Sequence, residues 1–352
     1  MRTHKIAAIP GDGIGPEVLA AGLTVLEEVE KTEGFQLNTI QFPWGSNFYL
    51  QHGRMVKEGG IESLRGFDAI YFGAVGSKEV PDHITVWDLI LPIRQKFDQY
   101  VNLRPMRLLP GLKSPLGGRG PADIDMVCVR ENTEGEYSGV GGFVHRGRAG
   151  ELANEVATFT RAGITRVATF AFELARTRPK RLVASATKSN ALRHSMVLWD
   201  EVLEEVAGRF PDVMCRKYHV DALAARMVTQ PDTVDVIVAS NLFGDILTDL
   251  GAAISGSLGT APSGNLDPTR KNPSMFEPIH GSAPDIAGKG IANPIGAVWA
   301  GAMMLEHLGE KKAAARVVGA IEKVTAEGKV RTPDLGGTAN TNDMTRALID
   351  AL

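Results

Sequence analysis

The chain has 352 residues, of which 43% are hydrophobic and 22% charged, a composition typical of a globular protein with a large core. A formal net charge of -3 excludes the strongly basic proteins that bind nucleic acid or anionic membranes. Two cysteines, Cys128 and Cys215, are too few for a disulfide framework or a cysteine-based zinc site. The first residues lack the apolar core of a signal peptide, and no apolar run reaches membrane-spanning length, so we expect a cytoplasmic protein.

Strand-like and helix-like segments alternate along the chain, which predicts an α/β fold. A first strand at residues 5–10 runs into the turn GDGIGPE at 11–17, and a helix is expected at 16–31. The glycine spacing is G-x-G-x-G-P rather than G-x-G-x-x-G, and no acidic residue ends a second strand at the required distance. We therefore do not predict a Rossmann dinucleotide fold, although such a turn can still bring backbone N–H groups near a ligand.

Short apolar runs predict further buried strands. They lie at residues 67–72, 124–129, 181–186, 215–220 and 234–239. The glycine-rich, polar segment 139–159 predicts a hairpin-like excursion from the core. The stretch 256–293, rich in Gly, Pro and Asn, predicts an irregular functional segment, and closing helices are expected at 297–308 and 311–327.

Asp245 and Asp249 lie four residues apart at the start of a predicted helix, directly after the strand 234–239. This spacing puts both carboxylates on one helix face, where like charges repel, so a bound Mg²⁺ or Mn²⁺ would account for the pair. Asp221 follows the preceding predicted strand and can supply a third carboxylate. The alternative interpretation is an ordinary solvated acidic helix face.

Three arginines occur near the ends of predicted elements: Arg94, Arg104 and Arg130. Guanidinium groups bind carboxylates in a bidentate manner, so three of them in one region indicate a polyanionic small molecule. A single arginine of this kind is by default a surface salt bridge.

Tyr137 lies in a polar, glycine-rich stretch, and Lys188 follows a predicted strand, where α/β sheets bind ligands. A tyrosine can serve as an acid and a lysine as a base, and we expect nearby arginine and metal charge to lower the pKa of either toward neutrality. Taken alone, each residue is also compatible with a structural role.

The segment from His280 to Asn293 combines small residues with a histidine, an aspartate and an asparagine. Such a loop can wrap an adenosine through backbone contacts. Asp285 can bind ribose hydroxyls and would repel a 2′-phosphate, which favours NAD over NADP.

Together these motifs resemble one known family. GDGIGPE, LPIRQKFDQYVNLRP, RENTEGEYSG, TKSN, NLFGDILTD and EPIHGSAPDIAGKGIANP occur here in the same order as in the metal-dependent β-decarboxylating dehydrogenases, which include the isopropylmalate, isocitrate, homoisocitrate and tartrate/D-malate dehydrogenases. The resemblance covers about residues 5 to 350.

The resemblance implies an α/β fold of the isopropylmalate/isocitrate dehydrogenase type, which is not a Rossmann fold. One domain, on the cofactor side, would combine residues 1–99 and 255–352, and residues 100–254 would form the substrate, metal and dimerisation domain. The segment at about 139–160 resembles the arm with which members of the family clasp a second subunit. A homodimer is therefore expected.

The resemblance also implies roles for individual residues. Arg94, Arg104 and Arg130 would hold the substrate carboxylates, Tyr137 would protonate the enol carbon after CO₂ loss, and Lys188 with Asp221 would act as the base. The metal, Mn²⁺ or Mg²⁺, would be bound by Asp221, Asp245 and Asp249, with Lys188 and Asp221 reaching the partner's site. The NAD-binding site would be lined by His280, Gly281, Ser282, Ala283, Asp285, Ile286 and Asn293. Whether K⁺ is also required stays open.

The segment before Arg94 distinguishes the members of the family. Isocitrate dehydrogenases have Ser and Asn where this chain has Asp88 and Ile90, and isopropylmalate dehydrogenases usually have Glu where it has Trp87. A bulky Trp87 followed by Ile90 and Leu91 leaves room only for hydrogen or hydroxyl at C3, which resembles the tartrate/D-malate dehydrogenases. We therefore expect NAD-dependent oxidation of D-malate to pyruvate and CO₂, with activity on tartrate. The alternatives are a 3-isopropylmalate dehydrogenase and a non-catalytic regulatory subunit.

Overall fold

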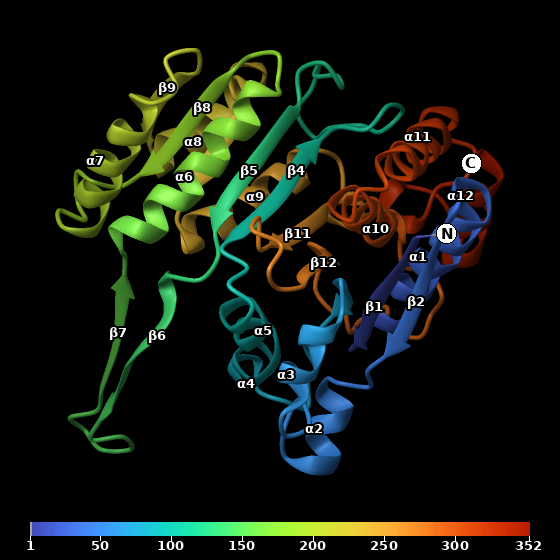
Figure 1. Ribbon diagram of the computed structural model, residues 1–352, viewed down its shortest axis with the longest axis horizontal. Coiled ribbons are helices and arrows are strands. Elements are labelled where there is room, and N and C mark those ends of the chain that lie inside the picture. The colour runs from blue at the N-terminus through green and yellow to red at the C-terminus, as the bar shows by residue number, and fades with distance from the viewer. Residues whose placement is uncertain (1) are drawn as a thin grey trace.

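The computed structural model describes residues 2–352. A ten-stranded mixed sheet runs through the whole molecule, and a separate two-stranded ribbon projects from it (Figure 1). In spatial order the sheet consists of β2 (Phe35–Gln41), β1 (Arg2–Gly11), β3 (Ala69–Ala74), β12 (Ser274–Pro278), β11 (Pro262–Leu266), β4 (Val101–Arg107), β5 (Asp125–Glu131), β10 (Val236–Ala239), β8 (Leu182–Thr187) and β9 (Met214–His219). The ribbon pairs β6 (Gly135–Val144) with β7 (Leu152–Thr158).

Twelve α-helices within residues 2–352 connect and cover these strands. They are α1 (Gly15–Glu33), α2 (Ser46–His52), α3 (Gly60–Ser63), α4 (Asp82–Thr85), α5 (Leu91–Lys96), α6 (Arg161–Arg176), α7 (Ser195–Ala207), α8 (Val220–Thr229), α9 (Asn241–Ile254), α10 (Ile295–His307), α11 (Lys311–Glu327) and α12 (Thr341–Ala351). A π-helical turn, Val86–Ile90, precedes α5. No helix in the described part of the chain is both long and apolar enough to cross a bilayer.

The strand order separates the chain into two halves. The five strands from β2 to β11 come from residues outside 100–254, and the five from β4 to β9 come from within that range. The two halves meet where β11 pairs antiparallel with β4. At this seam the buried Asn102 amide donates to Ser263 Oγ at 2.8 Å and to Asn265 Oδ1 at 2.9 Å, which pairs polar groups that would otherwise be costly to bury. The two-domain division is compatible with this order and stays a prediction.

Alternation along the strands gives the sheet two different faces. On the rear face, Val127, Val129 and Phe276 belong to one continuous apolar cluster with α1, α6, α7 and α10. On the opposite face, which we call the site face, Met126 and Cys128 pack under α8 and α9 in one cluster. A separate site-face cluster packs α5 against β1 and β3. The site face therefore has two apolar clusters, and polar residues occupy the region between them.

Most predicted elements agree with the structure to within a few residues, and the closing helix 311–327 has the same bounds as α11. The hairpin prediction at 139–159 is confirmed by β6 and β7. The prediction of an irregular stretch at 256–293 is wrong in part, because β11 and β12 lie there as fully buried strands in the middle of the sheet. Pairing with β4 and β3 on either side overrides the low strand propensity of their Gly, Pro and Asn residues.

Candidate active site

Strand alternation places two of the predicted arginines on the site face. On β4 the side chain of Arg104 points to the same face of the sheet as that of Met106. On β5 the side chain of Arg130 points to the same face as those of Met126 and Cys128. Both guanidinium groups lie under α9, where Asp245 accepts a hydrogen bond from Arg130 and one of 3.3 Å from Arg104. The sequence therefore brings a helix carboxylate and two strand arginines together.

Small and polar residues of α9 make this approach possible. A side chain on Gly244 would place its Cβ only 2.6 Å from the Cβ and Cγ atoms of Arg130, so only glycine lets the arginine lie against the helix. Asn241 Oδ1 accepts hydrogen bonds from Arg130 Nε at 3.0 Å and Nη2 at 2.7 Å. Thr248 Oγ1 accepts one from Arg104 Nη1 at 2.7 Å. The sequence reasoning did not assign Asn241 or Thr248 to the site, although both belong to the helix that follows a predicted strand.

Arg94 reaches the same place from α5. It forms an ion pair with Glu277 of β12, with Nη2 and Oε1 3.0 Å apart and both side chains only 8% exposed. The Nε atoms of Arg94 and Arg104 are buried and have no hydrogen-bond partner within residues 2–352. Glu277 was not predicted from the sequence, because its position three residues before His280 gave no sign that it would face Arg94.

A cavity of about 410 Å³ lies where these groups converge, and its size is that of a small-molecule site. All six predicted substrate-binding residues line it together with Tyr137 and Asp245: Trp87, Ile90, Leu91, Arg94, Arg104 and Arg130. Three further lining residues were missed by sequence reasoning: Asp82, His83 and Val86. They belong to α4 and to the π-helical turn that follows it, whose position depends on tertiary packing.

The electrostatics of the cavity differ from the sequence-based expectation at Tyr137. Its hydroxyl donates to Asp245 Oδ2 at 3.3 Å. Burial and the Asp245 charge raise the pKa of Tyr137, and Arg130 opposes them only in part. Arg130 thus lowers this pKa in the expected direction, but burial and Asp245 outweigh it, and the expected effect of a metal stays a prediction. The hydroxyl keeps its proton at neutral pH, as a proton donor must.

The pKa values of the two aspartates on α9, Asp245 and Asp249, are shifted in opposite directions. Burial alone would raise the pKa of Asp245, but Arg130, Arg104 and Arg94 outweigh it and hold the pKa below its usual value. Burial raises the pKa of Asp249, which forms no ion pair within residues 2–352. Asp249, which has no cation partner within residues 2–352, lies one helical turn from the ionised Asp245, and two such carboxylates suit a divalent metal.

Lys188 and Asp221 lie apart from this cavity. Lys188 Nζ is 2.6 Å from Asp221 Oδ1, and this hydrogen bond lowers the pKa of Asp221. The Asp221 carboxylate is 67% exposed, and no group of three metal-binding side chains forms within residues 2–352 of one chain. The single chain therefore does not bring the three predicted metal ligands together.

A second cavity, of about 880 Å³, runs alongside the predicted cofactor loop. It is lined by residues 75–86 in part and by Gly281, Ser282 and Ala283. Gly13, in the left-handed region with φ +59°, lies so close to Ser282 O that a Cβ would come within 1.9 Å of it. The Asp12 carboxylate accepts from the Ser46 N–H at 2.7 Å and the Gly76 N–H at 2.9 Å. The first glycine turn therefore packs directly against the predicted cofactor loop.

The remaining predicted cofactor residues surround this loop. The Nε2 atom of His280 is buried and has no hydrogen-bond partner within residues 2–352, so it offers a group to an incoming ligand. Asp285 is 85% exposed and lies 2.9 Å from Lys78 Nζ. Ile286 packs with Ala283 on a small apolar cluster, and Asn293 donates to Asp334 at 2.9 Å. These features fit a nucleotide bound along the loop.

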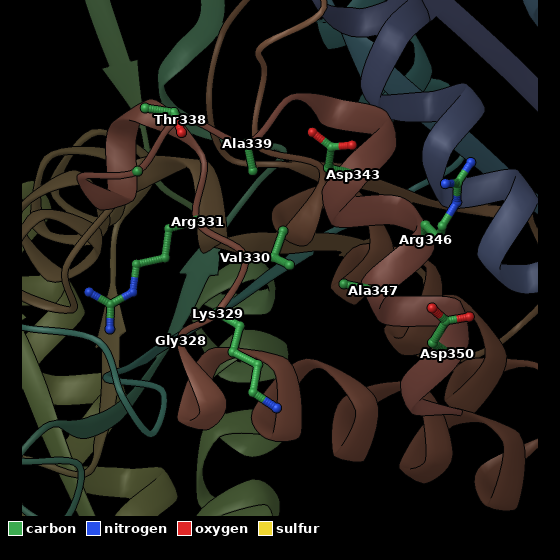
Figure 2. Close-up of a pocket in the computed structure, with 11 residues that line it drawn as sticks. Gly328, Lys329, Val330, Arg331, Thr338, Ala339, Asp343, Arg346, Ala347 and Asp350 are labelled. Carbon is green, nitrogen blue, oxygen red and sulfur yellow. The ribbon is translucent and has the colours of Figure 1, made fainter.

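A cavity of about 560 Å³ lies elsewhere, near α12, and contains none of the predicted site residues. Figure 2 shows that the charged groups of Arg331 and Arg346 point to opposite sides of it rather than toward one another. Lys329 is paired with Glu327 at 3.0 Å. These charges do not converge on a common ligand position.

Comparisons with known proteins identify the family. The sequence profile described as isocitrate/isopropylmalate dehydrogenase matches residues 5–348. The chain belongs to the isocitrate/isopropylmalate dehydrogenase family. A probable tartrate dehydrogenase/decarboxylase of Agrobacterium vitis is 59% identical to it over 100% of this chain and 98% of the relative. The D-malate dehydrogenase (decarboxylating) of Escherichia coli K12 is 52% identical over 99% of this chain and 98% of the relative.

The solved structures confirm the predicted fold class. An isocitrate dehydrogenase from Methylococcus capsulatus superposes with a TM-score of 0.89 at 36% identity, and the match covers 99% of each chain. The family resemblance seen in the sequence motifs is thus confirmed along the whole chain. Membership of this family makes the protein an oxidoreductase, a decarboxylating dehydrogenase.

Proposed function

We propose that the protein catalyses the NAD-dependent oxidative decarboxylation of D-malate to pyruvate and CO₂, and that it also acts on tartrate. The observation that carries this proposal is the convergence of Arg94, Arg104, Arg130 and Tyr137 around Asp245 in one cavity. Relatives named tartrate dehydrogenase/decarboxylase and D-malate dehydrogenase (decarboxylating) support the choice of substrate.

Each residue has a defined task in this proposal. The three guanidinium groups bind the two carboxylates of the diacid and fix its orientation. Lys188, held by Asp221, removes the proton of the substrate hydroxyl, and Tyr137 later gives its proton to the carbon that loses CO₂. When bound, NAD⁺ would supply the acceptor for the hydride from C2, and Mn²⁺ or Mg²⁺ would supply Lewis acidity. Asp245 and Asp249 would hold the metal, with Asp221 completing its protein ligands.

A homodimer with shared active sites is part of the proposal. The ribbon β6–β7 projects from the body and carries exposed apolar side chains, among them Val140, Phe143 and Leu152 (Figure 1). Such a surface is costly to leave in water and suits burial against a second subunit. Because Asp221 and Lys188 do not line the cavity of their own chain, we assign them to the site of the partner. The proposed location is the cytoplasm.

The second candidate function is that of a 3-isopropylmalate dehydrogenase. Val86, Ile90 and Leu91 form an apolar wall of the cavity, against which an isopropyl group would pack. Initial rates with NAD⁺ and Mn²⁺ on D-malate, the tartrate isomers, 3-isopropylmalate and isocitrate separate the two. The proposal expects the highest kcat/KM for D-malate or a tartrate. A higher kcat/KM for 3-isopropylmalate would select the second candidate, and no turnover of any diacid would favour the non-catalytic subunit.

A further inference from the structure

A cavity of about 360 Å³ on the rear face of the sheet has no part in the proposed reaction. Its walls come from both halves of the molecule, and its apolar residues are Leu103, Phe170, Leu174, Leu266, Phe276 and Met303. Four of these side chains, Leu103, Phe170, Leu174 and Met303, are only partly buried although they adjoin the main core. Apolar surface of this kind is normally filled by neighbouring side chains or by a ligand.

The mouth of the cavity is positively charged. Arg270, Lys311 and Glu306 line it, and neither cation forms an ion pair within residues 2–352. His307 also lines it, with its ring 5.5 Å from that of Phe276. Burial, reinforced by Arg270, lowers the pKa of His307 to about 4, so this ring is neutral at pH 7. Two cations and one carboxylate therefore face an apolar interior.

The backbone at Arg270 gives independent support. This residue lies in the turn between β11 and β12 with φ +58°, the left-handed region where glycine or asparagine is normally found. An arginine there costs conformational free energy that glycine would not. Its guanidinium lies at the mouth of the cavity and close enough to His307 to influence it. Such a strained position is compatible with a side chain retained to bind a ligand.

The cavity lies directly behind the substrate arginines. Leu103 precedes Arg104 on β4, and Phe276 precedes Glu277, the partner of Arg94, on β12. Because neighbouring side chains on a strand point to opposite faces, Leu103 and Phe276 line the rear cavity while Arg104 and Glu277 face the site. A molecule that displaces the first pair moves the strands that carry the second.

We propose that this rear cavity binds a small amphipathic carboxylate, with its apolar body among the six apolar side chains and its carboxylate on Arg270 and Lys311, and that its occupancy changes the affinity of the active site for the diacid. The volume suits a small molecule rather than a protein segment. An acid is favoured over an amine because cations outnumber the single carboxylate at the mouth.

Isothermal titration of the full-length protein with octanoate tests the site without any need for enzymatic activity. We expect saturable binding with one octanoate per chain, and octan-1-amine should bind at least about tenfold more weakly. Arg270→Gly should fold, because glycine suits φ +58°, and should weaken octanoate binding about tenfold. Lys271→Ala removes an exposed neighbouring cation that does not line the cavity, and should leave binding unchanged. Absence of saturable binding, or equal affinity in the Arg270→Gly variant, would overturn the site.

Coupling to the active site has its own measurement. We expect octanoate to change the KM for D-malate without competing with it, and the change should be lost in Arg270→Gly but kept in Lys271→Ala. By linkage, the factor by which octanoate changes the Kd for D-malate at constant Mn²⁺, measured without NAD⁺, should equal the factor by which saturating D-malate changes the octanoate Kd. A KM and a Kd that stay constant would overturn the coupling. Octanoate binding is measured without substrate, so failure of the proposed reaction and failure of this site are distinguishable.

Discussion

The Tyr137 hydroxyl donates a hydrogen bond to Asp245, at 3.3 Å from Oδ2, and thereby joins the proposed acid to a proposed metal ligand. Burial and the Asp245 charge together raise the pKa of this phenol. A cation on Asp245 neutralises that charge, so Mn²⁺ should lower the pKa of Tyr137. Ultraviolet titration of wild type against Tyr137→Phe, with and without Mn²⁺, isolates this one phenol among the five tyrosines. A pKa that Mn²⁺ does not move would contradict the ligand role of Asp245.

Shared active sites predict complementation between two inactive variants. Tyr137→Phe and Lys188→Ala should each be nearly inactive as homodimers. In a mixed dimer, one site receives an intact Tyr137 from one subunit and an intact Lys188 from the other, so random exchange should restore about a quarter of wild-type activity. If Lys188 serves the cavity of its own chain, mixing restores nothing, which would refute the shared site.

Trp87 is expected to set the size of the substrate accepted. It lines the substrate cavity, and a Cβ added to Gly139 would lie 3.0 Å from its ring, so the middle of β6 lies against one side of the ring. Trp87→Ala should shift the kcat/KM ratio toward 3-isopropylmalate by about 10- to 100-fold, the usual value for apolar pocket contacts. The control is Trp87→Phe, which keeps an aromatic wall and should shift the ratio much less. An unchanged ratio in the alanine variant would exclude Trp87 as the determinant.

Asp285 should determine the choice between NAD and NADP. Its carboxylate is exposed beside the predicted cofactor loop, and Lys78 lowers its pKa, so it is ionised at neutral pH. A negative charge there repels a 2′-phosphate, whereas Asp285→Asn leaves Lys78 free to attract one. We expect the ratio of kcat/KM for NADP⁺ to that for NAD⁺ to rise about tenfold or more in this variant. Glu58→Gln, an exposed acid elsewhere, is the control and should leave the ratio unchanged.

The lowered pKa of His307 predicts that the free energy of unfolding depends on pH in a specific way. Burial and Arg270 lower its folded-state pKa to about 4, below the value of about 6.5 expected in the unfolded chain. Between these two values the unfolded chain binds the additional proton, so the free energy of unfolding falls as the pH drops through this window, by up to about 3 kcal/mol. Urea denaturation at pH 7 and pH 5 should show a smaller loss for His307→Leu than for wild type. Equal losses would show that His307 is not protonated on unfolding.

Most helices and strands could be predicted from the sequence, but few of the contacts between distant segments could. Asp245 and Asp249 could be placed on one face of a helix because the periodicity of NLFGDILTD is local. Arg130 could be placed near the end of a strand, and it lies near the end of β5, whereas Arg104 lies in the middle of β4. The hydrogen-bond partners of the two arginines were harder to predict. Thr248 and Asn241 become hydrogen-bond acceptors only once α9 is docked on β4 and β5.

The largest error was the prediction of irregular structure where β11 and β12 lie. It too arose because contacts between distant segments cannot be predicted from local sequence. Pro262, Gly264 and Asn265 have low strand propensity, and their strand exists because β4 and β12 pair with it on both sides. Glu277 was missed for this reason, since its contact with Arg94 depends on β12 lying beside β3. The sequence indicated the nearby arginine that lowers the pKa of Tyr137, but not the burial or the hydrogen bond to Asp245 that raise it.

The most direct test of the proposed reaction is the product balance from D-malate. Purified protein with NAD⁺ and Mn²⁺ should form NADH, pyruvate and CO₂ in equal amounts, and chelation of the metal should stop the reaction. Asp245→Asn should lower this turnover about a hundredfold or more, because it removes a proposed metal ligand that two arginines hold in place. NADH formed without CO₂, or turnover that persists undiminished after chelation, would contradict metal-dependent oxidative decarboxylation.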